Sequence, residues 1–181
     1  MSIFTREVVR VSFFIFISST SFFANSSSFK EKSGDVLEVA MPLFTMGLSY
    51  YHDDNEGMKE FALALSGTVL TATLLKKSVS KERPDDSDDD AFPSGHAAIT
   101  FSSASYLERR YGWTYGLPAY SLATWTAYTR LNSDQHQIED VLAGAAIGYL
   151  FSYLLVEPNE EFFIAPVITK DNFALEAGFK F

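Results

Sequence analysis

The sequence predicts a single all-α domain, a helical bundle of about five to six helices followed by a short C-terminal β-strand. Long apolar segments show helical spacing and are separated by short polar or charged stretches. A chain of 181 residues, 47% of them hydrophobic, suffices for one core but not for two ordinary domains. The tail changes to strict alternation of apolar residues over residues 173–181, which is the period of a strand.

Residues 1–24 are predicted to be a signal peptide or an N-terminal anchor. Arg6 and Arg10 precede the apolar run 11–17, and small residues follow, which is the order found in secretory signals. Bulky aromatics before the expected cleavage point keep the uncleaved anchor open. We therefore expect an exported, periplasmic protein of a bacterium, with residues 25–33 as a Ser-rich linker.

The bundle is expected over residues 34–157. Asp35 stands near the start of the first helix, and Pro93 with Ser94 opens the third. The C-terminal extension, residues 158–181, ends in the strand, which must pack on the domain or on a partner because a lone strand is unstable. The predicted helices cover 34–51, 58–76, 93–110, 117–129 and 138–156.

Composition excludes several functions. A formal net charge of -9 disfavours nucleic acid as a partner, and any phosphate site must be a local basic cluster that overrides this field. The absence of cysteine excludes disulfides, thiolate catalysis and the usual zinc cages. A mean hydropathy of +0.03 is low for a bundle of membrane spans, so a soluble or membrane-associated bundle is favoured.

Three separated motifs carry the chemistry. In the second, a hydroxyl, a glycine and a histidine fall at a predicted helix start, where free N–H groups and the helix dipole attract an anion. In the third, a histidine and an aspartate four residues apart share a helix face, so the carboxylate is expected to hydrogen-bond the imidazole. The motifs are Lys76-x6-Arg83-Pro84, Pro93-Ser94-Gly95-His96 and Arg130-x5-His136-x3-Asp140.

Cations in these motifs match a phosphoryl group. Lys76, Arg83 and Arg130 together would neutralise its oxygens without a metal, and a guanidinium can hold two oxygens at once. We expect no cofactor and no metal. The neighbouring Lys77, Lys81, Arg109 and Arg110 are interpreted as solvated, and so is the acidic loop at residues 85–90.

The three motifs, in this order, resemble the signature of the type 2 phosphatidic acid phosphatase family, which shares its fold with bacterial acid phosphatases and vanadium haloperoxidases. The resemblance covers residues 76–140 and is specific because all three spaced motifs are present. One departure is Thr129, where the family usually has Ser before the arginine.

The resemblance implies a role for each matching residue. His136 attacks phosphorus and becomes a phosphohistidine, with Asp140 orienting it, while His96 is the general acid and then the general base. Because one histidine must be neutral and the other protonated, a bell-shaped pH profile is expected. The residues expected to bind the phosphoryl oxygens are Lys76, Arg83, Ser94, Gly95 and Arg130.

The substrate stays open at this stage. A phosphate monoester or diphosphate of a membrane lipid is favoured, which makes the membrane surface an expected partner. The alternative is a soluble, broad-specificity periplasmic acid phosphatase that takes small phosphomonoesters. A non-hydrolytic phosphate- or vanadate-binding protein, a haloperoxidase, and an envelope protein docked through its terminal strand are further hypotheses.

Overall fold

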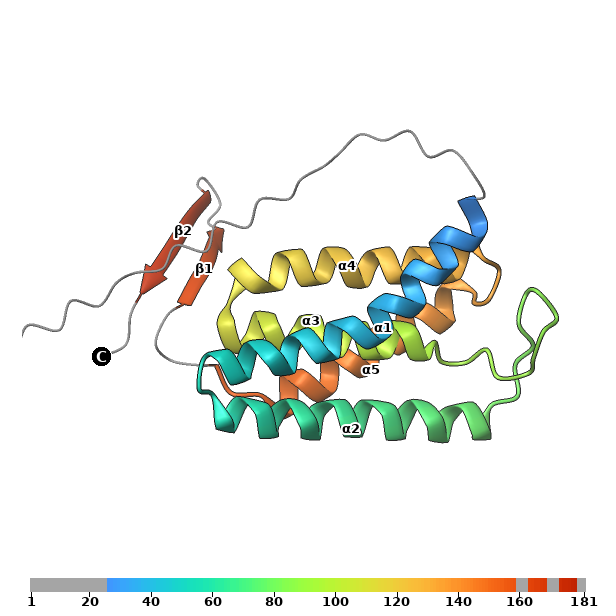
Figure 1. The fold of residues 1–181 in the computed structure, drawn as a ribbon, viewed down its shortest axis with the longest axis horizontal. Coiled ribbons are helices and arrows are strands. Elements are labelled where there is room, and N and C mark those ends of the chain that lie inside the picture. The colour runs from blue at the N-terminus through green and yellow to red at the C-terminus, as the bar shows by residue number, and fades with distance from the viewer. Residues whose placement is uncertain (1–25, 159–162, 169–172, 179–181) are drawn as a thin grey trace, which may run out of the picture.

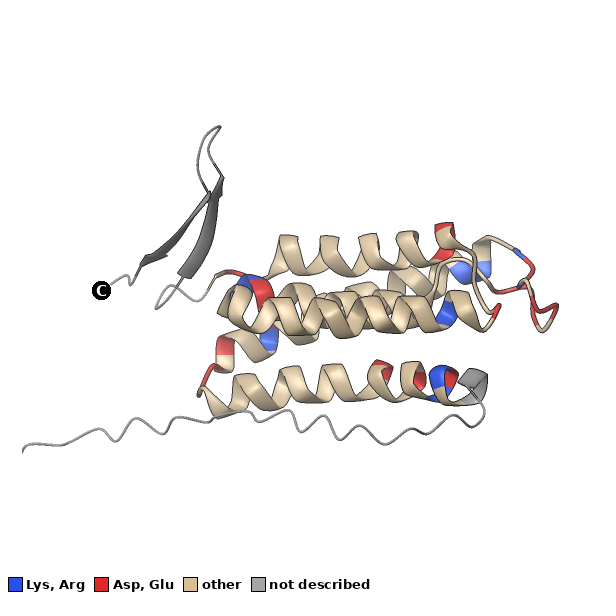
Figure 2. Ribbon diagram, turned by 90° about the horizontal axis from the view of Figure 1, so that it is seen from above, with Lys and Arg blue, Asp and Glu red and all other residues tan. Residues whose placement is uncertain are grey.

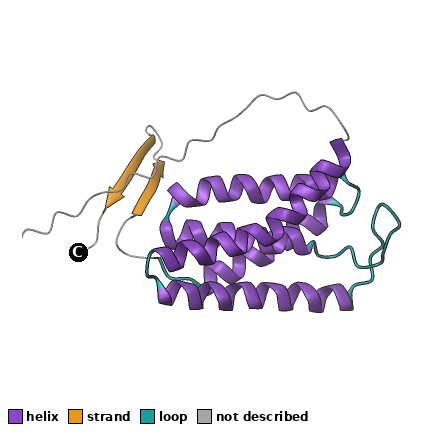
Figure 3. Cartoon of the chain, viewed as in Figure 1, coloured by secondary structure: helices purple, strands orange, loops and turns teal. Residues whose placement is uncertain are grey.

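The computed structural model describes residues 26–158, 163–168 and 173–178. Five helices form one bundle, and two short strands follow (Figures 1 and 3). This confirms the predicted all-α fold. The elements are α1 Ser26–Tyr51, α2 Asn55–Ser78, α3 Gly95–Tyr111, α4 Trp113–Asn132, α5 Ile138–Leu155, β1 Phe163–Ile168 and β2 Phe173–Gly178.

Helix α3 is the centre of the bundle and contacts the other four helices, most extensively α5 and α4. Two glycines of α5, Gly144 and Gly148, let the backbones of α3 and α5 approach closely. A Cβ at either position would overlap the carbonyl oxygen of Ser94 or of Ala98. The beginning of α5 is therefore held directly against the beginning of α3.

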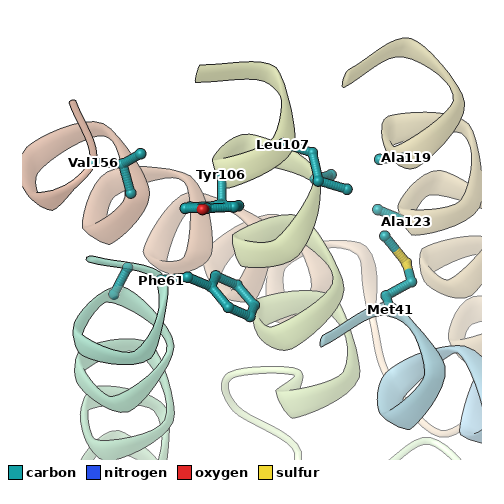
Figure 4. Close-up of a cluster of buried hydrophobic side chains, with 9 residues drawn as sticks. Met41, Phe61, Tyr106, Leu107, Ala119, Ala123 and Val156 are labelled. Atoms are coloured by element: carbon teal, nitrogen blue, oxygen red, sulfur yellow. The ribbon is translucent and has the colours of Figure 1, made fainter. Parts of the chain in front are cut away.

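The core lies where α1, α2, α3 and α4 meet (Figure 4). Phe61 and Tyr106 are fully buried, with ring centroids 4.8 Å apart, and the Tyr106 hydroxyl bonds Ser49 Oγ at 2.7 Å. Most other buried side chains are small, including Ala104 and Ala123. Small residues allow tight helix packing, which leaves many larger apolar side chains pointing outward.

Several boundaries differ from those expected. The first helix begins at Ser26, so most of the predicted linker 25–33 is helical, whereas the predicted signal segment 1–24 lies outside the described residues. Helix α4 begins at Trp113, before the expected residue 117, because Gly112 (φ 78°) ends α3, and Pro118 lies inside α4.

The C-terminal extension contains a hairpin instead of a single strand. The predicted strand is present as β2, and β1, which we did not predict, pairs with it in an antiparallel register that sets Phe163 opposite Gly178. The expectation of a strand is thus confirmed, and the partner it requires comes from the same chain.

Charged residues gather toward the two ends of the bundle and leave its middle uncharged (Figure 2). Large apolar side chains are exposed on the four outer helices, and α2 and α5 are long and apolar enough to cross a membrane. An apolar surface of this kind is typical of a membrane-associated protein. The exposed side chains include Val36, Leu43 and Phe44 of α1, Leu63, Leu70 and Leu74 of α2, Leu117, Leu122 and Trp125 of α4, and Leu142, Leu150 and Leu154 of α5.

The sequence led us to expect that Arg110 is solvated. This expectation is wrong, because Arg110 belongs to a network that closes one end of the bundle. It donates to Asp54 at 2.6 Å and to Glu60 at 3.2 Å, and Asp54 also caps α2 by accepting from the Gly57 backbone N–H. Arg109 donates to the Val156 carbonyl. This end is therefore structural, and the predicted site residues lie at the other.

Candidate active site

All eight predicted site residues lie at one end of the bundle, where α2 and α4 end and α3 and α5 begin. One backbone hydrogen bond joins the second motif to the third, since Ser94 N–H donates to the Asp140 carbonyl at 2.9 Å. Within the third motif, His136 N–H donates to the Arg130 carbonyl at 3.3 Å. The up-and-down order of the helices thus assembles residues that are up to 64 positions apart in sequence, from Lys76 to Asp140.

Lys76 and Arg83 are brought together by Asp90. The Arg83 guanidinium donates twice to Asp90 Oδ1, at 2.6 and 3.0 Å, and Lys76 Nζ lies 3.5 Å from Asp90 Oδ2. Burial raises the pKa of the Asp90 carboxyl, but the Arg83 hydrogen bonds and the Lys76 charge outweigh it and hold that pKa below its ordinary value. One residue of the acidic loop is therefore not merely solvated, and its two oxygens bridge the cations much as phosphoryl oxygens would.

Ser94 and Gly95 form the start of α3. Ser94 is fully buried and caps the helix, with its Oγ accepting from the Ala97 N–H at 3.4 Å. No atom lies within 4 Å of where a Gly95 Cβ would be, so the space above this backbone is open. It belongs to a cavity of about 190 Å³ that is also lined by Lys76 and Glu38.

His136 and Asp140 lie close together without the expected hydrogen bond. His136 Nδ1 is 3.9 Å from Asp140 Oδ2, and this buried nitrogen has no hydrogen-bond partner. Because α5 begins at Ile138, His136 precedes the helix, and the expectation that His136 and Asp140 share a helix face is wrong. Asp140 Oδ2 instead accepts from the Gln137 N–H at 2.8 Å, as part of a capping box.

Lys81, which we interpreted as solvated from the sequence, instead contacts a residue of the site. Its Nζ lies 2.6 Å from Asp140 Oδ1 and 2.9 Å from Glu139 Oε1, and Asp140 is fully buried. The contact spans 59 positions, and no spacing rule within one helix could reveal it. A buried carboxylate requires a counter-charge, which Lys81 supplies.

The surroundings keep His136 neutral. Burial lowers the pKa of its imidazole to about 4, and the positive charges of Lys76 and Arg83 act in the same direction. A neutral imidazole has a lone pair available on one ring nitrogen over the whole ordinary pH range. That is the state a nucleophile or a proton acceptor requires.

His96 and Arg130 form the other side of the site, against α1. Arg130, fully buried, donates to Asp35 Oδ1 at 2.9 Å and to Gln135 Oε1 at 2.7 Å, and its guanidinium lies 3.5 Å from His96 Nε2. The same Nε2 is 3.0 Å from a carboxylate oxygen of Asp35 and 3.0 Å from one of Glu38. These α1 carboxylates were also not predicted.

The arrangement combines an anion-binding helix start, three cations and two histidines. Together the fold and these residues define a helical phosphate-ester hydrolase. The sequence model of the PAP2 superfamily matches residues 58–160. The chain belongs to the PAP2 superfamily and is a phosphoric ester hydrolase.

Curated relatives agree with this assignment. The chain is 32% identical over 157 residues to a protein of Helicobacter pylori named lipid A 4'-phosphatase, covering 78% of this chain and 77% of the relative. It is 35% identical over 96 residues to the lipid A 1-phosphatase of Porphyromonas gingivalis, covering 51% of this chain but only 21% of that longer protein.

A solved structure has the same fold. The crystal structure of Aquifex aeolicus LpxE superposes with a TM-score of 0.62 at 20% sequence identity, over 71% of this chain and 83% of the other. At this identity the likeness establishes the architecture of the bundle. Because the family match begins at residue 58, α1 and its carboxylates lie outside it.

Proposed function

We propose that this protein removes phosphate from a phosphorylated membrane lipid, of the lipid A type, at the membrane surface on the exported side of a bacterium. The observation that carries the proposal is the juxtaposition of the phosphate-binding end with an outward apolar surface on four helices. A soluble phosphatase has no need of such a surface, since exposed apolar patches of this extent mark membrane contact. The names of the curated relatives support the lipid A class.

Uncharged segments are aligned across the bundle. They cover residues 39–51, 61–75, 97–107, 113–129 and 141–155, and each ends next to a charged site residue or next to the Arg110 network. We infer that this uncharged part of the bundle contacts the hydrocarbon of the bilayer through the outer helices, with the charged ends at the interfaces. Helices α2 and α5 are long and apolar enough to cross it. His96, Lys76 and the loops of the site then lie outside the hydrocarbon.

The cavity beside the site supports a lipid substrate. It reaches from Lys76 and Gly95 to the apolar side chains of Val69, Ala98 and Ile99, between α1, α2 and α3. A second, more open hollow on α2 shares Val69 and continues over Leu65 and Leu70. A phosphate held at Lys76 would thus have an apolar path for its chains along α2.

The proposed reaction has two steps. His136 attacks phosphorus through the nitrogen that faces away from Asp140, a P–N bond forms, and the P–O bond to the lipid breaks while His96 gives a proton to the leaving oxygen. Water then attacks the phosphohistidine, His96 takes its proton, the P–N bond breaks and phosphate leaves. Lys76, Arg83, Arg130 and the start of α3 hold the phosphoryl oxygens throughout.

The substrate class is tested by comparing rates in excess chelator with the enzyme in mixed micelles. The substrates are a lipid phosphate with full acyl chains, its short-chain analogue and p-nitrophenyl phosphate. We expect kcat/KM to fall as the chains are shortened, because binding energy from the chains is lost. Equal kcat/KM for all three would support the soluble acid phosphatase instead, and a requirement for metal would contradict the proposed chemistry.

A further inference from the structure

Helix α1 contacts His96, although no residue of the three motifs lies on α1. Asp35 and Glu38 stand one helical turn apart on α1, and one oxygen of each lies 3.0 Å from the same nitrogen, Nε2 of His96. Both precede the uncharged segment 39–51 of their helix. Two other carboxylates at this end, Asp90 and Asp140, contact Arg83 of the first motif and Lys81, which lies within the spacing of that motif.

We propose that Asp35 and Glu38 are positioning residues that hold the proton and the ring orientation of His96, the general acid of the proposed reaction. A carboxylate on Nε2 fixes the tautomer with hydrogen on that nitrogen and stabilises the doubly protonated ring. Nδ1 is then the nitrogen that exchanges its proton with the leaving group and with water. The inference rests on the proposed function, because it needs His96 to act as an acid.

The charges around His96 explain why it needs such support. Burial lowers the pKa of His96 and the Arg130 charge lowers it further, whereas Glu38 and Asp35 raise it. Glu38 also lines the cavity beside the site, together with Lys76 of α2. The balance leaves the pKa of His96 below its ordinary value, and loss of the α1 carboxylates would lower that pKa further, which weakens His96 as an acid near neutral pH.

The two carboxylates are not equivalent. Asp35 also binds Arg130 at 2.9 Å, so a phosphoryl group that takes this guanidinium must displace it. Glu38 pairs with His96 alone among the ion pairs of the described residues, and its side chain is 28% exposed against 52% for Asp35. Glu38 therefore shares no cation with the phosphoryl group, which makes it the sharper target for mutation.

Leaving-group dependence tests the proposal. An alkyl phosphate needs a proton on its departing oxygen, whereas the p-nitrophenolate ion leaves without one. In Glu38→Gln we expect kcat for a short-chain lipid phosphate to fall roughly tenfold or more, and kcat for p-nitrophenyl phosphate to change far less. The basic limb of the pH profile should move to lower pH, and Glu38→Asp should restore part of both effects.

Two further variants serve as controls for the effect of Glu38→Gln. Glu56→Gln, at an exposed carboxylate of the opposite end, controls for loss of charge and should behave as wild type. His96→Ala should show the same selective loss as Glu38→Gln, but larger. If His96→Ala is selective and Glu38→Gln lowers both substrates equally or neither, the α1 proposal is wrong; if His96→Ala itself lacks selectivity, the assignment of His96 as acid fails.

Discussion

At the residue scale, the site is governed by how each charge is compensated. Asp90 bridges Lys76 and Arg83, and Lys81 compensates the buried Asp140. Asp90 holds the two cations together before substrate arrives, which lowers the cost of assembling them. The three motifs made it possible to predict which residues meet, but not these counter-charges, because they come from loops and from α1.

The first prediction concerns the acid limit of activity. Since burial lowers the pKa of His136 to about 4, the nucleophile is neutral above that value and is lost as pH falls through it. We expect kcat/KM to fall roughly tenfold per pH unit below that point, which steady-state rates in chelator would measure. An acid limb of the kcat/KM profile that remains near the ordinary pKa of histidine, after correction for substrate ionisation, would contradict this prediction.

The second prediction concerns Lys81. In Lys81→Met the uncompensated Asp140 charge should stabilise protonated His136, moving the acid limb toward higher pH by roughly one unit. Lys77→Met removes a nearby exposed cation and should leave the limb in place. Both variants are measured with the same substrate, so ionisation of the substrate affects their two pH profiles equally. Identical pH profiles of the two variants would exclude Lys81 from this role.

At the element scale, the junction of α3 and α5 fixes the site. Ser94 N–H binds the Asp140 carbonyl, and glycines at the same interface bring the two backbones into contact. The helices themselves were predictable from apolar spacing, and all five end within three residues of the expected position. The starts were less predictable: the helix expected from residue 117 begins at Trp113, and the Ser-rich stretch before residue 34 contains the beginning of α1.

The third prediction follows from that junction. Gly144→Ala places a methyl group on the Ser94 carbonyl, so the two helices must separate, at a cost of about 1–3 kcal/mol in unfolding free energy. Activity should fall with stability because the start of α3 moves. Gly47→Ala, where a Cβ meets no atom, should instead stabilise α1 by about 0.5–1 kcal/mol. Thermal unfolding in detergent measures both, and equal effects would exclude a close α3–α5 contact.

At the scale of the whole molecule, polarity is sorted along the axis of the bundle. One charged end carries the chemistry, the other is closed by Arg110 with Asp54 and Glu60, and apolar side chains cover the outer helices between them. Average hydropathy concealed this sorting, since charges at the two ends cancel the apolar middle in a mean over the chain. Only the folded arrangement separates the two regions in space.

The fourth prediction tests this placement in the bilayer. The two tryptophans, Trp113 and Trp125, are 41% and 40% exposed and lie on α4 beside the uncharged middle. In vesicles containing lipids with brominated acyl chains, both should be quenched, as single-tryptophan variants Trp113→Phe and Trp125→Phe would show. Quenching by aqueous iodide but not by bromolipid would place the bundle outside the membrane.

The central claim is that phosphate leaves the lipid through a covalent bond to His136. The most direct measurement is to quench the enzyme rapidly during turnover of a lipid phosphate in excess chelator and to map the phosphorylated residue by mass spectrometry under alkaline conditions, which preserve phosphohistidine. We predict one phosphoryl group on His136 in wild type, accumulation of it in a variant slow in the second step, and none in His136→Ala. Turnover in His136→Ala, or a phosphoryl group on any other residue, would contradict the account.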